Sequence, residues 1–498
     1  MIYMKRRELL TTAMSVFAAS TFPAGNGFAA DFQAVGSQGE KVALNEAAIA
    51  DLQKHNKGGV ILPTSADYET ARKIWNGSFN NRHPALIVRC ADNNDVISAV
   101  QFARRHNLLT AVRCGGHSYS GQSTCDGGLV IDLGPYNTTV VDPGKKIARV
   151  DGGSMLRSLD RASEKYGLAT TAGYVSHTGV GGLTTGGGQG RLQRKFGLSI
   201  DNLLSVDVVT ADGKLLHADA NENPDLFWAV RGGGGNFGIV TMFEFQLHEL
   251  SPIVTSFNYT YAMADAVDVF KFYFDFNDQA SDDMVAGAGM RRGAEGAPTV
   301  SISGTFIGSQ KEAEAQLAPL AKFSKKPINA RVGEARYADL QAGADNENAA
   351  GREFYSRYAF FNHVDPKLPE ALVKTFMRGD GPPARTSMSI GSQGGVSGRI
   401  PENATAYAHR DAPYQLSTSA DWIEKSEGQG LMKFCRESHA ALLPYSDGGF
   451  YINQTTDEGE KQIRDNYRGN YERLVDAKTK YDPTNFFHLN ANIRPRKA

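Results

Sequence analysis

Three glycine-rich segments hold the residues whose types and spacing are best suited to chemistry. They read Arg-Cys-Gly-Gly-His-Ser-Tyr at 113–119, Gly-Val-Gly-Gly-Leu-Thr-Thr-Gly-Gly-Gly-Gln-Gly at 179–190 and Arg-Gly-Gly-Gly-Gly-Asn-Phe-Gly at 231–238. Glycine permits positive φ angles and lets backbone N–H groups come close to an anion. Tight packing turns would explain any one segment, but three in one region favour a large phosphate-bearing cofactor.

The third segment contains a formal GxGxxG pattern at Gly233, Gly235 and Gly238. A dinucleotide-binding fingerprint follows a strand and opens a helix. Here the order is reversed, because a helix pattern at 224–230 comes before the glycines and a strand pattern at 239–245 comes after them. The pattern therefore does not indicate a Rossmann domain.

Helices and strands alternate around these segments, as the spacing of apolar residues predicts. The expected elements are strands at 85–89, 109–113 and 129–132, helices at 96–103 and 155–166, and a hairpin with strands at 204–210 and 214–218. The strand, helix and strand between 85 and 113 form a βαβ-like unit. This pattern predicts the α+β class.

The remainder of the chain has a different character. Between 250 and 445 the glycine clusters thin out and alternating aromatic residues appear, such as Tyr355, Tyr358, Phe360 and Phe361. We interpret this region as a second domain that contains a sheet. An amphipathic helix is expected at about 458–480, in a C-terminal segment that docks back onto the first domain.

Composition is that of an ordinary globular protein. The 498 residues exceed one ordinary core at roughly 150 residues per domain, so we expect two or three folded units. Hydrophobic residues make up 41%, and 53 lysines and arginines nearly balance 54 aspartates and glutamates. With a net charge of −1 and no long basic block, nucleic acid is not an expected partner.

Four cysteines are too few for a disulfide-stapled scaffold, and their spacing predicts no metal site. They are Cys90, Cys114, Cys125 and Cys435. A pairing of Cys114 with Cys125 stays open, because a sequence does not supply the required geometry.

Residues 1–30 have the pattern of a signal peptide. A basic run at 5–7 precedes a mildly apolar stretch at 9–22, and the small residues Gly27 and Ala29 suit cleavage. Paired arginines in the basic run favour the twin-arginine machinery, which exports folded proteins. We therefore expect an exported protein, periplasmic or secreted. Because the apolar stretch is too short to span a bilayer, stable membrane insertion is not expected.

Residues 84–245 resemble the FAD-binding domain of berberine-bridge-enzyme-like oxidases, in the vanillyl-alcohol oxidase superfamily. The tail, Tyr-Ile-Asn at 451–453 and Tyr-Asp-Pro-Thr-Asn-Phe-Phe-His-Leu-Asn-Ala-Asn-Ile at 481–493, resembles that family's C-terminal signature. The resemblance implies an α+β fold with a two-part FAD-binding domain and a substrate domain whose antiparallel sheet is covered by helices. The implied bounds are 1–30 for the signal peptide, 47–249 for the FAD-binding domain, 250–445 for the substrate domain and 446–498 for a segment returning to the FAD domain.

The same resemblance implies that FAD is bonded through its 8α carbon to His117. A lone histidine is more often packed or exposed than bonded to a cofactor, so the Gly-Gly-His-Ser setting carries this expectation. Residues 113–119 would cover the FAD pyrophosphate, the second segment the flavin and ribityl side, Val240 the adenine side, and Asn490 would help to seat the ring. The implied cofactor-binding residues are Arg113, Cys114, Gly115, Gly116, His117, Ser118, Tyr119, Thr178, Gly179, Gly181, Gly182, Gly190, Val240 and Asn490.

Three positions depart from the family's usual pattern. Val175 stands where many relatives have a cysteine that forms a second flavin bond, so a single covalent link is expected. Leu183 stands where some relatives place a histidine near flavin N1, which leaves open what stabilises the reduced flavin. Thr178, at the position that influences oxygen access in relatives, is neither of the apolar residue types usual there.

The residues that the resemblance implies to be catalytic are Tyr451 and Asn453. Oxidation of an alcohol needs a hydride acceptor, which flavin N5 supplies, and a base for the hydroxyl proton. Tyr451 is expected to be this base and Asn453 to support it, with Asp457 as the carboxylate alternative. A phenol of pKa ~10 needs a stabilising neighbour to ionise near neutrality, and a merely packed tyrosine is the structural alternative.

The expected reaction is oxidation of a small alcohol-type substrate, a sugar, an oligosaccharide or an aromatic alcohol, with O2 as acceptor and H2O2 as product. The middle-domain aromatics suit an open cleft or a core equally, so substrate identity stays open. Two alternatives remain: an FAD-dependent dehydrogenase or secondary-metabolite tailoring oxidase, and a secreted flavin-binding protein without turnover.

Overall fold

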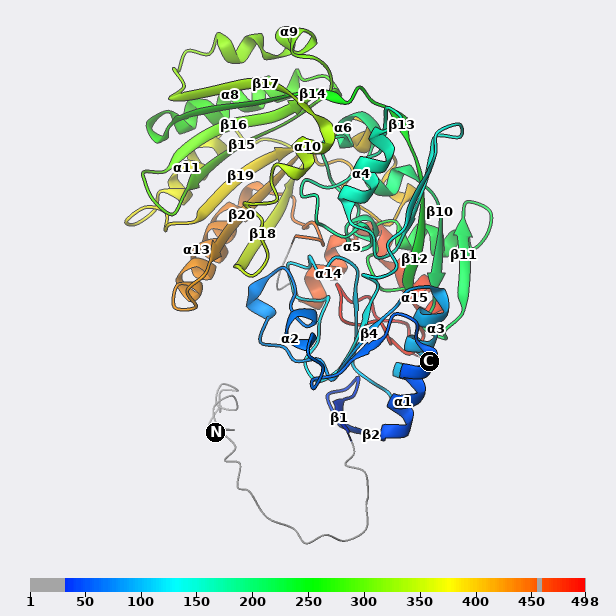
Figure 1. Cartoon of the computed structure of the whole chain (residues 1–498). Coiled ribbons are helices and arrows are strands. Elements are labelled where there is room, and N and C mark those ends of the chain that lie inside the picture. The colour runs from blue at the N-terminus through cyan, green and yellow to red at the C-terminus, as the bar shows by residue number, and fades with distance from the viewer. Residues whose placement is uncertain (1–31, 455–458, 498) are drawn as a thin grey trace, which may run out of the picture.

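The computed structural model describes residues 32–454 and 459–497. The expected signal peptide at 1–30 and the alternative base Asp457 lie outside these described residues. Figure 1 shows two lobes: one carries a large sheet from the middle of the chain, and the other holds smaller sheets together with the C-terminal residues.

The first sheet of the smaller-sheet lobe contains the expected βαβ unit. Its order is β3-β4-β6-β5, and β4, β6 and β5 run parallel. The strands are β3 (Val60–Ile61), β4 (Leu86–Arg89), β5 (Thr110–Arg113) and β6 (Leu129–Asp132). Helix α3 (Asn93–Arg105) connects β4 to β5 and begins after Asp92, whose carboxylate accepts the N–H groups of Asn94 and Asp95. The predicted strand, helix and strand are confirmed.

The second sheet is antiparallel, in the order β11-β10-β12-β8-β7. Its strands are β7 (Thr139–Asp142), β8 (Ile147–Asp151), β10 (Leu203–Val209), β11 (Leu215–Asp219) and β12 (Ile239–Gln246). Val209 pairs with Leu215, so the predicted hairpin is confirmed. Helix α7 (Pro224–Val230) precedes the third glycine segment and β12 follows it, which confirms that the segment is not a Rossmann fingerprint.

The third sheet builds the other lobe and is antiparallel throughout, in the order β17-β14-β16-β15-β19-β20-β18. Its strands are β14 (Ile253–Ala262), β15 (Met284–Arg292), β16 (Thr299–Phe306), β17 (Asn329–Arg336), β18 (Glu353–Phe361), β19 (Thr386–Ser392) and β20 (Tyr414–Trp422).

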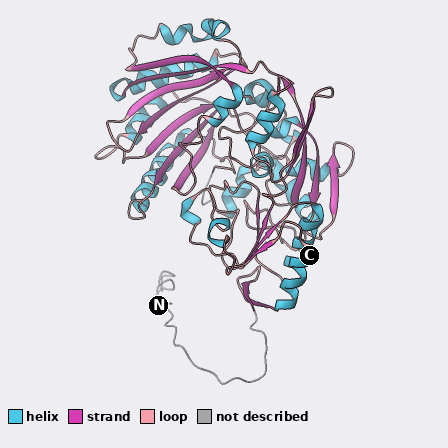
Figure 2. Cartoon of the chain, viewed as in Figure 1, coloured by secondary structure: helices cyan, strands magenta, loops and turns pink. Residues whose placement is uncertain are grey.

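Helices cover one face of this third sheet, as Figures 1 and 2 show. They are α8 (Ala266–Asp278), α9 (Gln310–Ala321), α11 (Leu368–Phe376) and α13 (Gly428–Leu442). The side chains of strand β20 accordingly alternate between the two faces of the sheet. Leu416, Ala420 and Trp422 join the core beneath the helices, whereas Ser417 and Ser419 are half-buried on the opposite face. That opposite face is turned toward the other lobe.

The remaining elements are short connectors that complete the two lobes. They are β1 (Phe32–Val35), β2 (Lys41–Leu44), α1 (Glu46–His55), α2 (Tyr68–Ala71), η1 (Gly77–Phe79), α4 (Leu156–Glu164), β9 (Leu168–Ala169), α5 (Val180–Thr185), α6 (Gln193–Phe196), η2 (Ser199–Asn202), β13 (His248–Glu249), η3 (Met263–Asp265), α10 (Tyr337–Ala342), α12 (Val396–Arg399), η4 (Glu402–Ala404) and η5 (Leu443–Tyr445). Helix α4 confirms the predicted helix at 155–166 in a shorter form.

The prediction of one C-terminal helix over 458–480 is wrong. The segment forms α14 (Glu460–Asn466), the short η6 (Arg468–Asn470) and α15 (Tyr471–Tyr481). Arg468 has a φ of 47°, which an α-helix does not contain. The side chain of Asn466 accepts the N–H of Phe450, and Asn470 donates to Glu402 and Thr405 carbonyls. These tertiary bonds stabilise the break, and hydrophobic spacing alone does not reveal them.

A buried cation fastens the C-terminal tail to the third glycine segment. Lys478 and Asp482 are both fully buried, and their Nζ and Oδ2 atoms lie 2.7 Å apart. Lys478 also donates to the carbonyls of Asn236 and Phe487, while Asp482 accepts the N–H groups of Phe486 and Phe487. Burial lowers the pKa of Lys478 and the nearby carboxylate opposes that shift. The tail therefore depends on one ion pair with no access to water.

We predict that Lys478→Met lowers the free energy of unfolding by about 3–5 kcal/mol, because it leaves Asp482 buried without its cation. Lys480→Met, on the same helix, removes an exposed partner of Asp225 and should cost less than about 1 kcal/mol. Chemical denaturation of both variants measures the difference. Equal stabilities for the two would contradict the assignment.

Candidate active site

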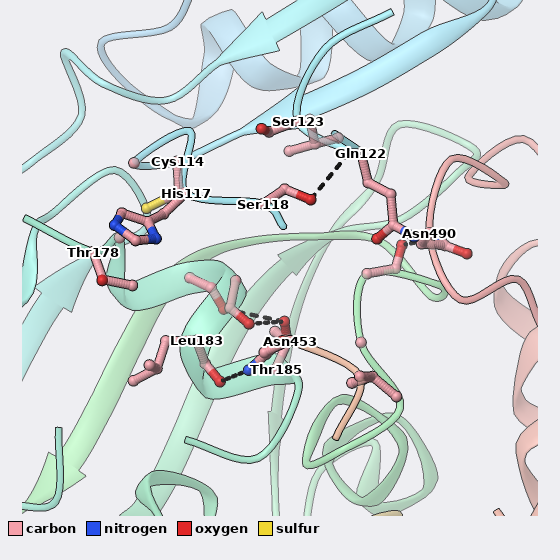
Figure 3. A pocket seen from close by; sticks show the side chains of 18 of the residues that line it. Cys114, His117, Ser118, Gln122, Ser123, Thr178, Leu183, Thr185, Asn453 and Asn490 are labelled. Atoms are coloured by element: carbon pink, nitrogen blue, oxygen red, sulfur yellow. Dashed lines mark hydrogen bonds between the residues drawn. The ribbon is translucent and has the colours of Figure 1, made fainter. Parts of the chain in front are cut away.

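One cavity collects residues from all three glycine-rich segments and from the C-terminal tail. Its walls come from 114–119 after β5, from within 173–185 around α5, from within 234–240 leading into β12, and from 451–454 and 487–491. Figure 3 shows His117 and Thr178 on one side of this space and Gln122 and Asn490 on the other. The cavity is therefore long enough to separate two chemically different ends.

His117 lies on the cavity wall in the loop that leaves β5. Gly116, just before it, has a φ of 65°, a backbone conformation that residues with a side chain rarely adopt. The Nε2 atom of His117 is buried and has no hydrogen-bond partner among the described residues. Burial and, to a smaller extent, the neighbouring His177 lower the pKa of His117 to about 3. The imidazole is therefore neutral near pH 7 and available to bond a ligand atom.

The first two glycine segments touch backbone to backbone. A Cβ at Gly115 would lie 2.5 Å from the backbone nitrogen of Gly179, and a Cβ at Gly179 would overlap Gly115 in return. By contrast, a Cβ at Gly182 or Gly235 would meet no heavy atom within 4 Å, and both residues line the cavity. Glycine thus permits close packing at the first pair and leaves open space for a ligand at the second.

The phenol of Tyr451 is buried at the cavity, and three N–H groups point at its oxygen. The backbone N–H groups of Gly188 and Gln189 donate over 3.0 and 3.1 Å, and Asn453 Nδ2 donates over 2.9 Å. Asn453 also donates to the Leu183 carbonyl over 2.8 Å (Figure 3). Burial raises the pKa of Tyr451, while the three donors oppose the rise because they stabilise a negative oxygen. The three donors are therefore placed to stabilise the phenol oxygen when it carries a negative charge.

Polar groups gather at the other end of the cavity. Ser118 Oγ accepts the Gln122 N–H over 3.0 Å, and Ser123 Oγ is buried without a partner among the described residues. Asn490 Nδ2 donates to the carbonyls of Gly235 and Phe487, which leaves its buried Oδ1 unpaired in the part of the chain that the structure describes. These hydroxyl and amide groups match the phosphate and hydroxyl groups of a dinucleotide.

Most of the predicted site residues line this one cavity. They are Cys114, Gly115, Gly116, His117, Ser118, Tyr119, Thr178, Gly179, Gly181, Gly182, Val240, Tyr451, Asn453 and Asn490. Arg113 and Gly190 are outside its lining. The Arg113 guanidinium pairs with Asp132 over 2.9 Å and joins β5 to β6, and a Cβ at Gly190 would overlap the Ala172 carbonyl oxygen. Both residues therefore serve packing in this structure, and their implied contact with FAD stays a prediction.

The three positions that depart from the family pattern also face the cavity. Val175, Thr178 and Leu183 are all part of its lining. An aliphatic side chain at Val175 has no atom that forms a thioether, and Leu183 offers no charge to a ligand. Cys114 lines the cavity as well, but it and the other three cysteines are free thiols.

Sequence reasoning missed several residues at the site. Gln122 and Ser123 continue the polar loop beyond Tyr119, and Gln454 follows directly on the Tyr-Ile-Asn motif, so their proximity to known motifs was a usable signal. Trp75, whose ring stacks on His117, lies 42 residues earlier in a segment without any motif. Only the folded chain brings it to the site.

Aromatic residues of the large sheet pack into two separate buried clusters, one of which includes Tyr451. Successive side chains of strand β18 point to opposite faces of the sheet. Tyr355 and Phe361 join the core beneath the helices, whereas Phe360 lies on the other face. Phe360 meets Tyr407 edge to face at 6.5 Å, and Tyr407 meets Tyr451 in the same manner at 6.5 Å. The aromatic alternation of β18 therefore serves the core beneath the helices on one face and the buried cluster around Tyr451 on the other.

Neither a metal-binding cluster nor a membrane-spanning helix is found within residues 32–454 and 459–497. No group of three or more histidine, cysteine, aspartate or glutamate side chains there is arranged to hold a metal ion. No helix in the same ranges is long and apolar enough to cross a membrane.

Known proteins share these features. A model described as an FAD binding domain matches residues 84–219, and one described as berberine and berberine like matches 451–494. The chain is 30% identical over 460 residues to (R)-6-hydroxynicotine oxidase of Paenarthrobacter nicotinovorans, covering 88% of this chain and 97% of that protein. The chain thus belongs to the berberine-bridge-enzyme-like family and is an FAD-linked oxidoreductase.

Two further relatives extend the comparison. Xylooligosaccharide oxidase of Thermothelomyces thermophilus is 27% identical over 495 residues, covering 93% of this chain and 98% of that protein. The crystal structure of 6-hydroxy-D-nicotine oxidase from Arthrobacter nicotinovorans superposes with a TM-score of 0.80 at 28% identity, over 89% of this chain and 98% of that one. The predicted α+β fold of the vanillyl-alcohol oxidase type is confirmed.

We predict that Gly182→Leu lowers the FAD content per chain several-fold, because a Cβ at this position points into open space at the cavity and the leucine side chain would occupy room that FAD needs. Gly430→Leu is the matched control. Gly430 is an exposed helical glycine, and a Cβ added there would also meet no heavy atom within 4 Å. Flavin absorbance per chain measures the effect. Normal FAD content in Gly182→Leu would place the cofactor elsewhere.

Proposed function

We propose that this chain is an oxidase in which FAD is bonded once, to His117, and which oxidises a small alcohol-type substrate with O2 as acceptor and H2O2 as product. The observation that carries the proposal is the Tyr451 oxygen, held at the FAD cavity by three N–H donors. Bound FAD supplies a hydride acceptor at flavin N5. The base for the hydroxyl proton comes from the protein.

Tyr451 is suited to be that base because three hydrogen-bond donors at its oxygen stabilise the ionised phenol and so oppose the effect of burial. The N–H groups of Gly188 and Gln189 and the amide of Asn453 stabilise the charge that remains after the phenol loses its proton. The ionised Tyr451 then accepts the substrate hydroxyl proton as the C–H bond breaks, and Asn453 keeps the oxygen in place.

A single covalent link is supported by the two residues that face the flavin end. His117 presents a neutral, buried imidazole with an unpaired nitrogen, and Val175 offers no second nucleophile. The eleven other predicted cofactor-binding residues that line the same cavity, named above, supply the rest of the FAD contacts.

The substrate is proposed to be a sugar, an oligosaccharide or an aromatic alcohol. Tyr119 and Tyr174, which line the cavity together with Tyr451, suit the flat or apolar face of either class. The relatives named above, a xylooligosaccharide oxidase and a hydroxynicotine oxidase, act on a sugar and on an aromatic ring system according to their names.

We predict that Tyr451→Phe lowers the rate of flavin reduction by substrate by roughly 10²–10⁴-fold, the usual contribution of a positioned base. The phenyl ring keeps the packing, so the variant should retain its covalent flavin and its visible spectrum. Anaerobic stopped-flow reduction with each substrate class measures the rate, and peroxide release under air separates an oxidase from a dehydrogenase. Full turnover in Tyr451→Phe would refute the assignment of the base.

The pH dependence follows from the raised pKa of Tyr451. A base acts in its deprotonated form, so the wild-type rate should increase as pH rises through the alkaline range and level off above the pKa of the phenol. In Tyr451→Phe this ascending limb should disappear. Asn453→Leu removes one donor and should shift the limb to higher pH, because the ionised phenol loses stabilisation. An unchanged limb in both variants would assign it to another group.

We further propose that the chain is exported in folded form, with the basic run at 5–7 directing it to the twin-arginine machinery. The support is the sequence pattern of residues 1–30. Replacing both Arg6 and Arg7 by lysine should leave the flavoprotein in the cytoplasmic fraction, while the unmodified chain appears outside it with a shortened N-terminus. Export of the double-lysine variant at the normal level would contradict this route.

A further inference from the structure

The indole ring of Trp75 lies face to face with the imidazole ring of His117. The ring centroids are 4.2 Å apart and the planes differ by 14°. Trp75 is 7% exposed and is not part of the cavity lining. The centroid of the His177 ring lies 5.0 Å from that of His117, and the planes of these two rings differ by 36°. Trp75 therefore contacts the imidazole without reaching the space for the cofactor.

Trp75 is itself bonded to both lobes of the molecule. Its N–H donates to the Gly116 carbonyl over 2.9 Å, directly before His117. Its Nε1 donates to the Asn348 carbonyl over 2.6 Å, and its own carbonyl accepts the Gly351 N–H over 3.0 Å. Asn348 and Gly351 belong to the connection between α10 and β18 in the large-sheet lobe. The indole thus has little freedom to turn.

The next residue, Asn76, joins the same segments a second time. Its fully buried amide exchanges two hydrogen bonds of 3.0 Å with the backbone of Phe354 in β18. Its Nδ2 also donates to the carbonyl of Tyr119 over 2.8 Å. Trp75 and Asn76 consequently bind the His117 loop on both sides of the histidine, through Gly116 and Tyr119, and connect it to the large sheet.

We propose that Trp75 is a positioning residue for the covalent attachment of FAD to His117. This inference rests on the proposed covalent bond. Attachment joins an imidazole nitrogen to the 8α carbon, releases one proton from that nitrogen and one from the methyl carbon, and frees two electrons that O2 accepts to give H2O2. A stacked indole limits rotation of the imidazole, so the reacting nitrogen is held in place before the bond forms.

Variants at Trp75 test this inference with covalent flavin as the readout. Full-length protein is produced under riboflavin limitation, FAD is added, and the flavin retained in the acid-precipitated pellet is followed over time. Trp75→Leu removes the flat ring and should slow attachment at least roughly tenfold, since a misplacement of ~1 Å can cost up to about 10²-fold. Trp75→Phe keeps a flat ring and should restore most of the rate.

Trp228→Leu is the matched control. Trp228 is also buried, donates its Nε1 to a backbone carbonyl, that of Asn403, over 2.8 Å, and lies outside the cavity lining. This variant should attach FAD at the wild-type rate even if its melting temperature falls. If Trp75→Leu does not accumulate, Trp75→Met takes its place, because methionine fills volume without a flat ring.

The possible outcomes separate this inference from the proposed function. A coloured wild-type pellet with equally fast attachment in folded Trp75→Leu, or in Trp75→Met, would overturn the role of Trp75 alone. Equal slowing in Trp228→Leu would also overturn it, since general destabilisation would then be the cause. A colourless wild-type pellet would overturn the covalent bond to His117 and this inference with it.

Discussion

The loop that carries His117 and the loop that precedes α5 meet at Gly115 and Gly179, so closely that a single Cβ on either would separate them. This approach places Gly182 and the Leu183 carbonyl at the cavity, and Asn453 binds that carbonyl. Asn453 in turn holds the oxygen of Tyr451, which also receives two N–H groups from the residues after α5. The imidazole and the phenol therefore belong to one connected network, although they are far apart in the chain.

Two further connections keep this network in register with the rest of the molecule. The buried Lys478 ammonium binds the tail to the third glycine segment and so places Asn490 at the cavity. The Trp75 segment binds the His117 loop to the large-sheet lobe. Each connection uses groups that are removed from water, where an unpaired polar group is costly. Both ends of the site are consequently fastened by buried bonds, and the His117 loop is connected to the large-sheet lobe.

Local pattern was enough to predict much of the fold and part of the site. Strand β4, helix α3 and strand β5 follow from apolar spacing, and the reversed order around Gly233 correctly excluded a Rossmann domain. The break at Arg468 depends on tertiary bonds made by Asn466 and Asn470, which spacing does not record. Trp75 lies in no motif, so only folding reveals its contact with His117.

Individual residues of the glycine segments also have roles that the local sequence does not predict. A glycine that makes room for a ligand, such as Gly182, and one that permits backbone packing, such as Gly190, are identical in the sequence. Their roles differ only in what a Cβ would meet. Arg113 gives a related case, because its charge is used by Asp132 inside the protein. Motif membership therefore identified the right loops, and the structure decided which of their side chains face the cavity.

The central claim, that one cavity joins a covalent flavin at His117 to the base at Tyr451, is tested most directly by peptide mass spectrometry of the digested, denatured protein. The account predicts that the peptide containing His117 carries FAD, that fragmentation places it on this histidine, and that no second flavin-linked peptide is found. An unmodified His117 peptide, with all flavin free in solution after denaturation, would contradict it.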